Sequence, residues 1–220
     1  MTAFLEPYVD YGAEWLPALL QAMRMTAMLS ASAFALSLVL GLLLACGRNV
    51  RSPMIQRLVA LYVATVRGIP LLALLFLIYF GLPGLGVTIN AFSAAVLGLA
   101  LAFAGQMAEL FRAGLMAIPR GQREAALAVG FTPYQSFTLI VLPQVVRIIV
   151  APLIVTFVSL LKDSSLASLI TVDELMLTGR SLSTEYFLPL QIFLAVGLCY
   201  FFIAWPFSLL AKRLTPSRAR

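Results

Sequence analysis

Long apolar runs with almost no charge dominate this chain of 220 residues and restrict it to one kind of fold. Residues 16–47, for example, include a single charged side chain, Arg24. A helix needs roughly 20 apolar residues to cross the hydrocarbon core of a bilayer. Only 11% of the residues are charged, whereas soluble domains carry about 25%. The sequence therefore predicts an all-α integral membrane protein whose residues 1–220 form one transmembrane domain.

Five membrane-spanning helices are predicted, at about residues 16–47, 58–82, 89–117, 136–161 and 185–211. Residues 167–184 are mixed in character and are predicted to form an outer, partly re-entrant segment. Acidic side chains gather on one side of this arrangement and basic side chains on the other. Because cytoplasmic loops are enriched in Lys and Arg, the N-terminus is expected outside and the C-terminus inside. The outer acids are Glu6, Asp10, Glu14, Asp173, Glu174 and Glu185, and the inner basic residues are Arg48, Arg51, Arg57, Arg120, Arg123, Lys212, Arg213, Arg218 and Arg220.

The sequence does not favour nucleic-acid binding, a disulfide or a metal site. The net charge of +6 would indicate nucleic acid only if it clustered on a soluble face, and here it flanks apolar runs. Cys46 and Cys199 lie in apolar stretches and are expected to be packed free thiols rather than a disulfide or metal site. No metal is expected. The first 14 residues are acidic rather than basic, so no cleavable signal peptide is expected.

One polar segment, residues 118–143, interrupts the apolar runs and reads IPRGQREAALAVGFTPYQSFTLIVLP. Pro119 suits the first position of a helix. The good helix formers from Arg120 to Val129 predict a helix of roughly 15 Å. Gly130 suits the position after a helix, where φ is often positive. Helical spacing places four mostly small residues on one face, which another surface can approach closely: Gln122, Ala125, Ala126 and Val129.

The spacing of this segment matches a family pattern, E-A-A-x3-G-x9-I-x-L-P, in which Ile140 is the isoleucine. It resembles the signature loop of membrane subunits of binding-protein-dependent ABC importers. The resemblance implies that the loop is an ATPase-coupling element. The coupling residues it implies are Gly121, Glu124, Ala125, Ala126, Gly130, Leu142 and Pro143. The alternative is an ordinary cytoplasmic connector that packs on its own protein.

Further pieces along nearly the whole chain resemble the polar-amino-acid branch of these permeases. They are residues 67–72 (RGIPLL), 109–114 (ELFRAG), 118–122 (IPRGQ), 142–144 (LPQ) with Arg147 and Pro152, and 162–166 (KDSSL). Members more often carry Thr at position 69, Gln at 74 and Tyr at 106, which leaves the exact substrate open. The resemblance implies the type I ABC importer permease fold with a cytoplasmic coupling helix. It also implies a pore subunit that moves a polar amino acid or derivative across a bacterial inner membrane.

The resemblance also implies partners. These are two ATP-binding cassette subunits, a second permease subunit that is identical or similar, an extracytoplasmic solute-binding protein and the lipid bilayer. No nucleic acid is expected. The chain has no G-x4-G-K-[ST] phosphate-binding loop. It is therefore expected to be a non-enzymatic transport subunit without a cofactor, with ATP and magnesium bound by the partner ATPase.

Ionisable side chains in or beside the predicted spans are candidates for the substrate site, because a charge in hydrocarbon must face a cavity or a partner. A zwitterionic amino acid needs a cation for its carboxylate and an anion for its ammonium, and Lys162 and Asp163 supply both. The candidate substrate-binding residues are Lys162, Asp163, Ser164, Ser165, Leu166, Glu109, Gln106 and Arg67. The alternative is a closed salt-bridge network that joins the spans.

Two other function classes remain open at this point. A secondary transporter or channel subunit for a small polar solute would usually show internal repeats, and the sequence shows no convincing one. It would also have no use for an ATPase-docking loop. A membrane subunit that only anchors a partner would not need a polar pathway.

Overall fold

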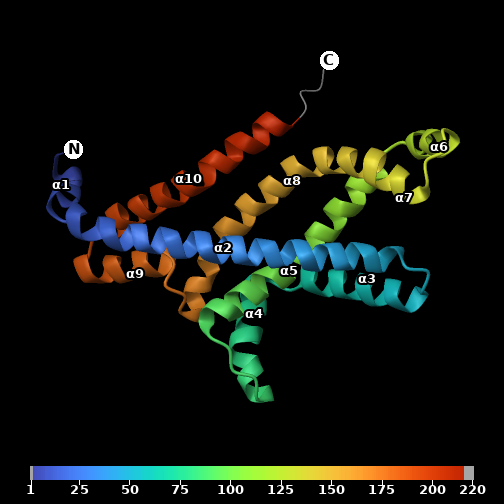
Figure 1. Cartoon of the computed structure of the whole chain (residues 1–220). Helices are drawn as coiled ribbons and strands as arrows, with labels where there is room; N and C mark the ends of the chain where they lie inside the picture. Colours follow the sequence, from blue (N-terminus) through green and yellow to red (C-terminus); the bar gives the residue numbers. More distant parts are fainter. Residues whose placement is uncertain (1, 216–220) are drawn as a thin grey trace.

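The computed structural model describes residues 2–215, which are helical with short connections and contain no strand (Figure 1). Arg218 and Arg220, predicted in the basic tail, lie outside the described residues. The α-helices are α1 (Thr2–Asp10), α2 (Gly12–Asn49), α3 (Pro53–Gly68), α4 (Leu71–Phe76), α5 (Ala91–Met116), α6 (Arg120–Ala128), α7 (Pro133–Gln135), α8 (Leu142–Asp163), α9 (Leu175–Tyr186) and α10 (Pro189–Leu214). Two π-helical turns, η1 (Leu77–Gly81) and η3 (Ser136–Val141), and two 3-10 turns, η2 (Leu82–Leu85) and η4 (Ser164–Ile170), connect them.

Four helical runs of the described chain are long and apolar enough to cross a membrane: α2, α5, the run Pro133–Ile170 and α10. They correspond to four of the five predicted spans, which confirms the all-helical membrane fold. A fifth span exists only if α3 and the run Leu71–Leu85 are counted together, and these two are bent by 107°.

The predicted second span, residues 58–82, is therefore not a single unbroken helix. The break falls at Ile69 and Pro70, between α3 and α4. Ile69 has φ −93° and ψ 129°, which is extended rather than helical. A proline disfavours the helical conformation of the residue before it. This local effect ends α3, and α4 then projects away from the bundle (Figure 1).

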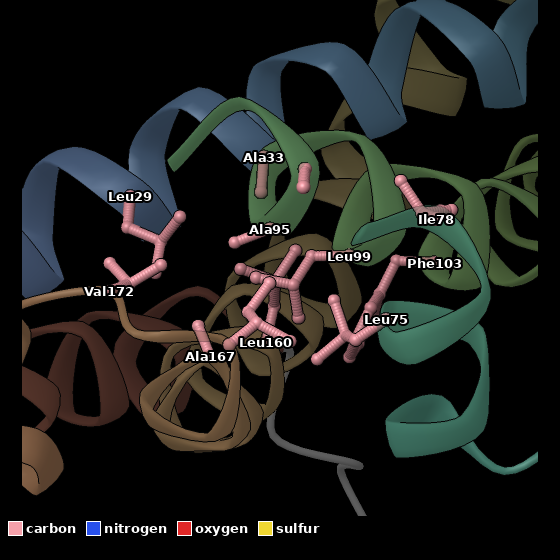
Figure 2. Packing of buried hydrophobic residues seen from close by; sticks show 12 residues of the cluster. Leu29, Ala33, Leu75, Ile78, Ala95, Leu99, Phe103, Leu160, Ala167 and Val172 are labelled. Atoms are coloured by element: carbon pink, nitrogen blue, oxygen red, sulfur yellow. The ribbon is translucent and has the colours of Figure 1, made fainter. Parts of the chain in front are cut away.

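The main core lies where α2 crosses α5 and where α4 and η4 pack against them. Figure 2 shows its buried side chains, among them Leu29, Leu75, Leu99 and Leu160. Small residues let the backbones of α2 and α5 approach closely, as is common between membrane helices. A Cβ atom added at Gly41 would lie only 2.3 Å from Cβ of Met107. The α2–α5 pair is therefore the rigid frame of the molecule.

A second cluster, rich in aromatic rings, joins the start of α2 to α9 and α10. Trp15 is buried there, with the rings of Tyr8, Tyr11 and Tyr186 packed around it. The Tyr186 hydroxyl donates to Glu14 at 2.6 Å, and this hydrogen bond raises the pKa of Tyr186 to about 12. The cluster lies at the opposite end of α2 from α6 (Figure 1).

Candidate functional site

The polar segment 118–143 forms a helical hairpin at one tip of the molecule (Figure 1). Pro119 precedes α6, which covers Arg120–Ala128, one residue shorter than predicted. Gly130 has φ +91°, as expected for a glycine that ends a helix. The Phe131 N–H donates to the Ala126 carbonyl and the Gly130 N–H to the Leu127 carbonyl, both at 3.1 Å. These two bonds form a Schellman motif, which stops α6 and reverses the chain.

A capping box after α6 directs the chain back towards the membrane helices. The Gln135 N–H donates to Oγ1 of Thr132, and the Thr132 N–H donates to Oε1 of Gln135. This capping box starts α7, which continues through η3 into α8. Leu142 and Pro143 lie where the π-helical turn η3 passes into α8. Local sequence therefore sets where α6 ends and where α7 begins.

Only part of the predicted small-sided face of α6 is exposed. Ala126 is only 6% exposed, because α6 packs against η3 of the same chain. The other predicted members of that face, Gln122, Ala125 and Val129, are exposed, and Val129 is 75% exposed. Gly121 and Glu124 are exposed as well. The surface available to a partner is therefore centred on these exposed residues, whereas Ala126 anchors α6 to its own protein.

A cavity of about 370 Å³ opens beside the start of α6. Its walls combine apolar side chains with two arginines, Arg120 and Arg123. Neither arginine forms an ion pair within the part of the chain that the structure describes, where both ion-pair contacts involve Glu109.

Glu109 joins α5 to the end of α2. Its carboxylate accepts hydrogen bonds from Nη1 of Arg48 and, at 2.7 Å, from Nη2 of Arg112. The Arg48–Glu109 ion pair therefore connects the end of α2 to α5, whereas the Arg112–Glu109 pair lies within α5. Glu109 is one of the predicted substrate-binding residues. The structure gives this carboxylate two cationic partners of its own, and its contact with substrate stays a prediction.

The predicted residues 162–166 stand where α8 ends and η4 begins. Lys162 and Asp163 are exposed, so both charges are presented to the surface of this subunit. Ser164 is buried, accepts a hydrogen bond from the Ser30 hydroxyl at 3.3 Å and donates to the Leu161 carbonyl. Leu166 packs against the main core. The two charges are therefore held on a turn that is anchored to α2.

Lys162 lines a cavity of about 480 Å³ whose other walls come from α10. These α10 residues were not predicted, because a mostly apolar set of side chains resembles ordinary membrane packing. They are Gly197, Tyr200, Phe201, Ala204, Trp205 and Ser208. Lys162, the only charged residue of the lining, therefore shares this cavity with the aromatic side chains of Tyr200, Phe201 and Trp205.

Behind this cavity lies a buried carboxylate. Glu174 was counted among the outer acids, but the structure buries it completely. It accepts hydrogen bonds from the Tyr200 hydroxyl and from the Leu177 N–H, while the Leu175 N–H donates to Oγ1 of Thr26. These contacts link α2, α9 and α10.

The remaining candidates lie in other places. Arg67 is exposed at the end of α3, next to the Ile69–Pro70 break. Ser165 is half-buried in η4. Gln106 is exposed and lines a separate cavity of about 420 Å³ between α5 and α8. The eight predicted residues therefore do not surround one cavity within this subunit.

The crossed α2–α5 frame, the broken second span and the protruding α6 hairpin define a multi-pass membrane subunit of a transport system. The family model of the binding-protein-dependent transport system inner membrane component matches residues 37–220, and the chain belongs to this family. The chain is thus a membrane transport subunit, with the type I ABC importer permease fold that the sequence predicted.

Individual relatives and solved structures agree with this family. The chain is 40% identical over 194 residues to a probable amino-acid ABC transporter permease protein, PatM, of Vibrio harveyi, covering 87% of each chain. It is 38% identical over 184 residues to a probable glutamine ABC transporter permease protein, GlnP, of Bacillus subtilis, covering 81% of this chain and 84% of that one. The crystal structure of an amino acid ABC transporter with histidines superposes with a TM-score of 0.84 at 29% identity, over 91% of this chain and 94% of the other.

Proposed function

We propose that this chain is the pore-forming subunit of an ATP-driven importer that carries a polar amino acid or a derivative into the cytoplasm. The observation that supports this most strongly is the family match over residues 37–220, combined with relatives that are named as amino-acid permeases. The α6 hairpin agrees with it, since neither a channel nor a secondary transporter requires an ATPase-docking element.

The energy source in this proposal is a separate pair of ATPase subunits. The exposed residues of α6 form the docking surface, and the Schellman motif at Gly130 gives the hairpin a fixed geometry through which a push can be transmitted. ATP and magnesium belong to those partners. A second permease subunit completes the pathway, and an extracytoplasmic solute-binding protein delivers the substrate to the side that carries the N-terminus and α9.

The substrate contacts in this proposal are Lys162 and Asp163. Both are exposed on the anchored turn between α8 and η4, and an ionisable group among membrane helices needs a cavity or a partner of opposite charge. The carboxylate of an amino acid would meet the Lys162 ammonium, and its ammonium would meet Asp163. Gln106 and Arg67 would line other parts of the route.

Uptake by intact cells tests the proposal. A strain without its own amino-acid importers receives this chain with an ATPase subunit and a binding protein of the same transport family, and accumulation of a radiolabelled amino-acid mixture is followed. We expect accumulation that disappears when this chain is omitted. Accumulation that persists without this chain, or no accumulation of any amino acid by the complete system, would reject the proposed function.

A further inference from the structure

The cavity beside the start of α6 combines positive charge with apolar walls. Its volume of about 370 Å³ is within the range of small-ligand pockets, roughly 300–1,000 Å³. Arg120 and Arg123 line it, and the lining contains no carboxylate among the described residues. Within the described part of the chain neither arginine forms an ion pair, not even with Glu124, which follows Arg120 by one helical turn. The cavity therefore offers two uncompensated cations to a ligand.

The two arginines can bind the same anionic group. They are three residues apart on α6, so they are neighbours on the surface of the helix. A guanidinium can donate two parallel hydrogen bonds to a phosphate, which gives arginine an advantage over lysine for this ligand. Both arginines belong to the N-terminal part of α6, where the helix dipole also favours negative charge. A phosphate is therefore the ligand group that this side of the cavity fits best.

The other walls are apolar and come from the segments that lead into membrane helices. Leu115 precedes the last residue of α5, and Phe137 and Val141 belong to η3, which leads into α8. The side chains of Leu115 and Phe137 are 36% and 44% exposed. Val141 is buried in an apolar cluster with Val145 and Ile149 of α8. A ligand whose phosphate binds the arginines therefore has an apolar surface beside it.

This combination favours a phospholipid over a soluble anion. The cavity lies where α5 ends at Met116, and α5 is long and apolar enough to cross a membrane. The polar headgroups of a bilayer lie at the ends of its spanning helices. A soluble phosphate would contact the arginines and leave the apolar walls in water, whereas a phospholipid covers both. Basic pockets beside membrane helices on the cytoplasmic side bind anionic headgroups in this way.

The cavity is also separate from the surface proposed to dock the ATPase. Successive residues of a helix are rotated by about 100°, so Arg120 and Val129, which are nine residues apart, lie on opposite sides of α6. The same rotation places the buried Ala126 between Arg123 and Val129, and Ala126 faces η3. A partner that docks on Ala125 and Val129 therefore leaves the side of the arginines open.

We infer that this cavity binds an anionic phospholipid of the cytoplasmic leaflet, such as phosphatidylglycerol. The lipid phosphate accepts hydrogen bonds from Arg120 and Arg123, and an acyl chain lies along Leu115 and Phe137. The inference takes from the proposed function only that α6 faces the cytoplasm. The bound lipid joins the end of α5 to the start of α6 and to η3, so it holds the α6 hairpin at the membrane surface.

Lipid binding to the permease–ATPase complex tests this inference. The complex of this chain with an ATPase subunit of the same transport family is purified and delipidated in detergent. Phosphatidylglycerol or phosphatidylcholine with the same acyl chains is added, and the dissociation constant of each lipid is measured by native mass spectrometry. We expect phosphatidylglycerol to bind at least tenfold more tightly. The double variant Arg120→Gln with Arg123→Gln should lose this preference while the complex stays assembled.

The double variant Arg51→Gln with Arg57→Gln is the matched control. It removes the same charge from two other exposed arginines on the side predicted to be cytoplasmic. The control should leave the dissociation constant of phosphatidylglycerol unchanged. Equal losses of affinity in the two double variants would show an effect of net charge alone and overturn the inference. Equal affinities of the unsubstituted complex for the two lipids would also overturn it.

Further outcomes separate the lipid from other anions. Inorganic phosphate at millimolar concentration should not displace phosphatidylglycerol, and displacement would identify a site for a soluble anion instead. If Arg120→Gln with Arg123→Gln lost the ATPase but still bound phosphatidylglycerol, the arginines would belong to the ATPase interface and the inference would be wrong. A complex that prefers phosphatidylglycerol but imports no amino acid rejects only the proposed function. A complex that imports amino acids without this lipid preference rejects only the present inference.

Discussion

The Tyr200 hydroxyl donates to the Glu174 carboxylate at 2.5 Å, and this hydrogen bond ties the middle of α10 to the start of α9. The other carboxylate oxygen accepts the Leu177 N–H at 3.0 Å and caps α9. One buried side chain therefore holds the wall of the Lys162 cavity and the helix behind it in a single arrangement.

Removing the Glu174 carboxylate should destabilise the subunit. Glu174→Ala removes the carboxylate that accepts from the Tyr200 hydroxyl and from the Leu177 N–H. Leaving a buried polar group unsatisfied costs about 1–3 kcal/mol. We expect a lower melting temperature of the purified complex and reduced uptake, while Glu174→Gln, which keeps an acceptor oxygen, loses less. Glu185→Ala is the control, because Glu185 is exposed. A melting temperature of Glu174→Ala equal to that of Glu185→Ala would contradict the structural role.

The geometry at Gly130 predicts a graded loss of coupling. Its φ of +91° lies in the left-handed region, where a residue with a side chain costs about 1–2 kcal/mol. Gly130→Val should distort the α6 hairpin and uncouple ATP hydrolysis from uptake, and Gly130→Asn should be milder because asparagine tolerates this region better. Uptake and binding-protein-stimulated hydrolysis are measured on the same preparations. If Gly130→Val coupled ATP hydrolysis to uptake as well as Gly130→Asn and the unsubstituted protein do, the geometry of the hairpin would not matter for coupling.

A substitution on the exposed face of α6 should release the ATPase partner. Val129→Asp replaces an apolar side chain that is 75% exposed with a charged one. We therefore expect the ATPase to dissociate during purification while the membrane domain stays folded. Ala126→Trp would instead disturb the packing of α6 on its own chain, since Ala126 is buried. A full complement of ATPase on Val129→Asp would show that this face is not the docking surface.

The charges at the end of α8 separate substrate binding from structure. We expect Lys162→Met and Asp163→Asn each to reduce uptake at least tenfold while the complex assembles normally, because each removes one of the two groups that a zwitterion requires. The double variant should stay inactive. If the double variant regained full uptake, the two charges would serve only to neutralise each other.

The sequence was sufficient for features that depend on neighbours along the chain. Gly130, the start of α6 after Pro119 and the four long spans are local in origin, and all four spans lie where they were predicted. The break at Pro70 is equally local. It was missed because the apolar run on both sides of the proline was taken as one span, although the residue before a proline disfavours helix.

Contacts between distant residues could not be predicted in the same way. Tyr200 follows Glu174 by 26 residues and lies on another helix, and only the packing of α9 on α10 brings them together. The burial of Ala126 depends likewise on η3, and the partner of Glu109 on α2 is 61 residues away. Periodicity shows which residues share a face of a helix but not which faces meet.

Reconstitution tests most directly whether ATP hydrolysis by partner subunits drives uptake through this chain. Proteoliposomes receive this chain with an ATPase subunit of the same transport family. The binding protein and a radiolabelled amino acid are placed on one side of the membrane, and ATP with magnesium on the other. We expect accumulation that requires the binding protein, ATP and magnesium and that is unaffected by ionophores. Accumulation by this chain alone in response to an ion gradient, without ATPase or ATP, would contradict the account and identify a secondary transporter.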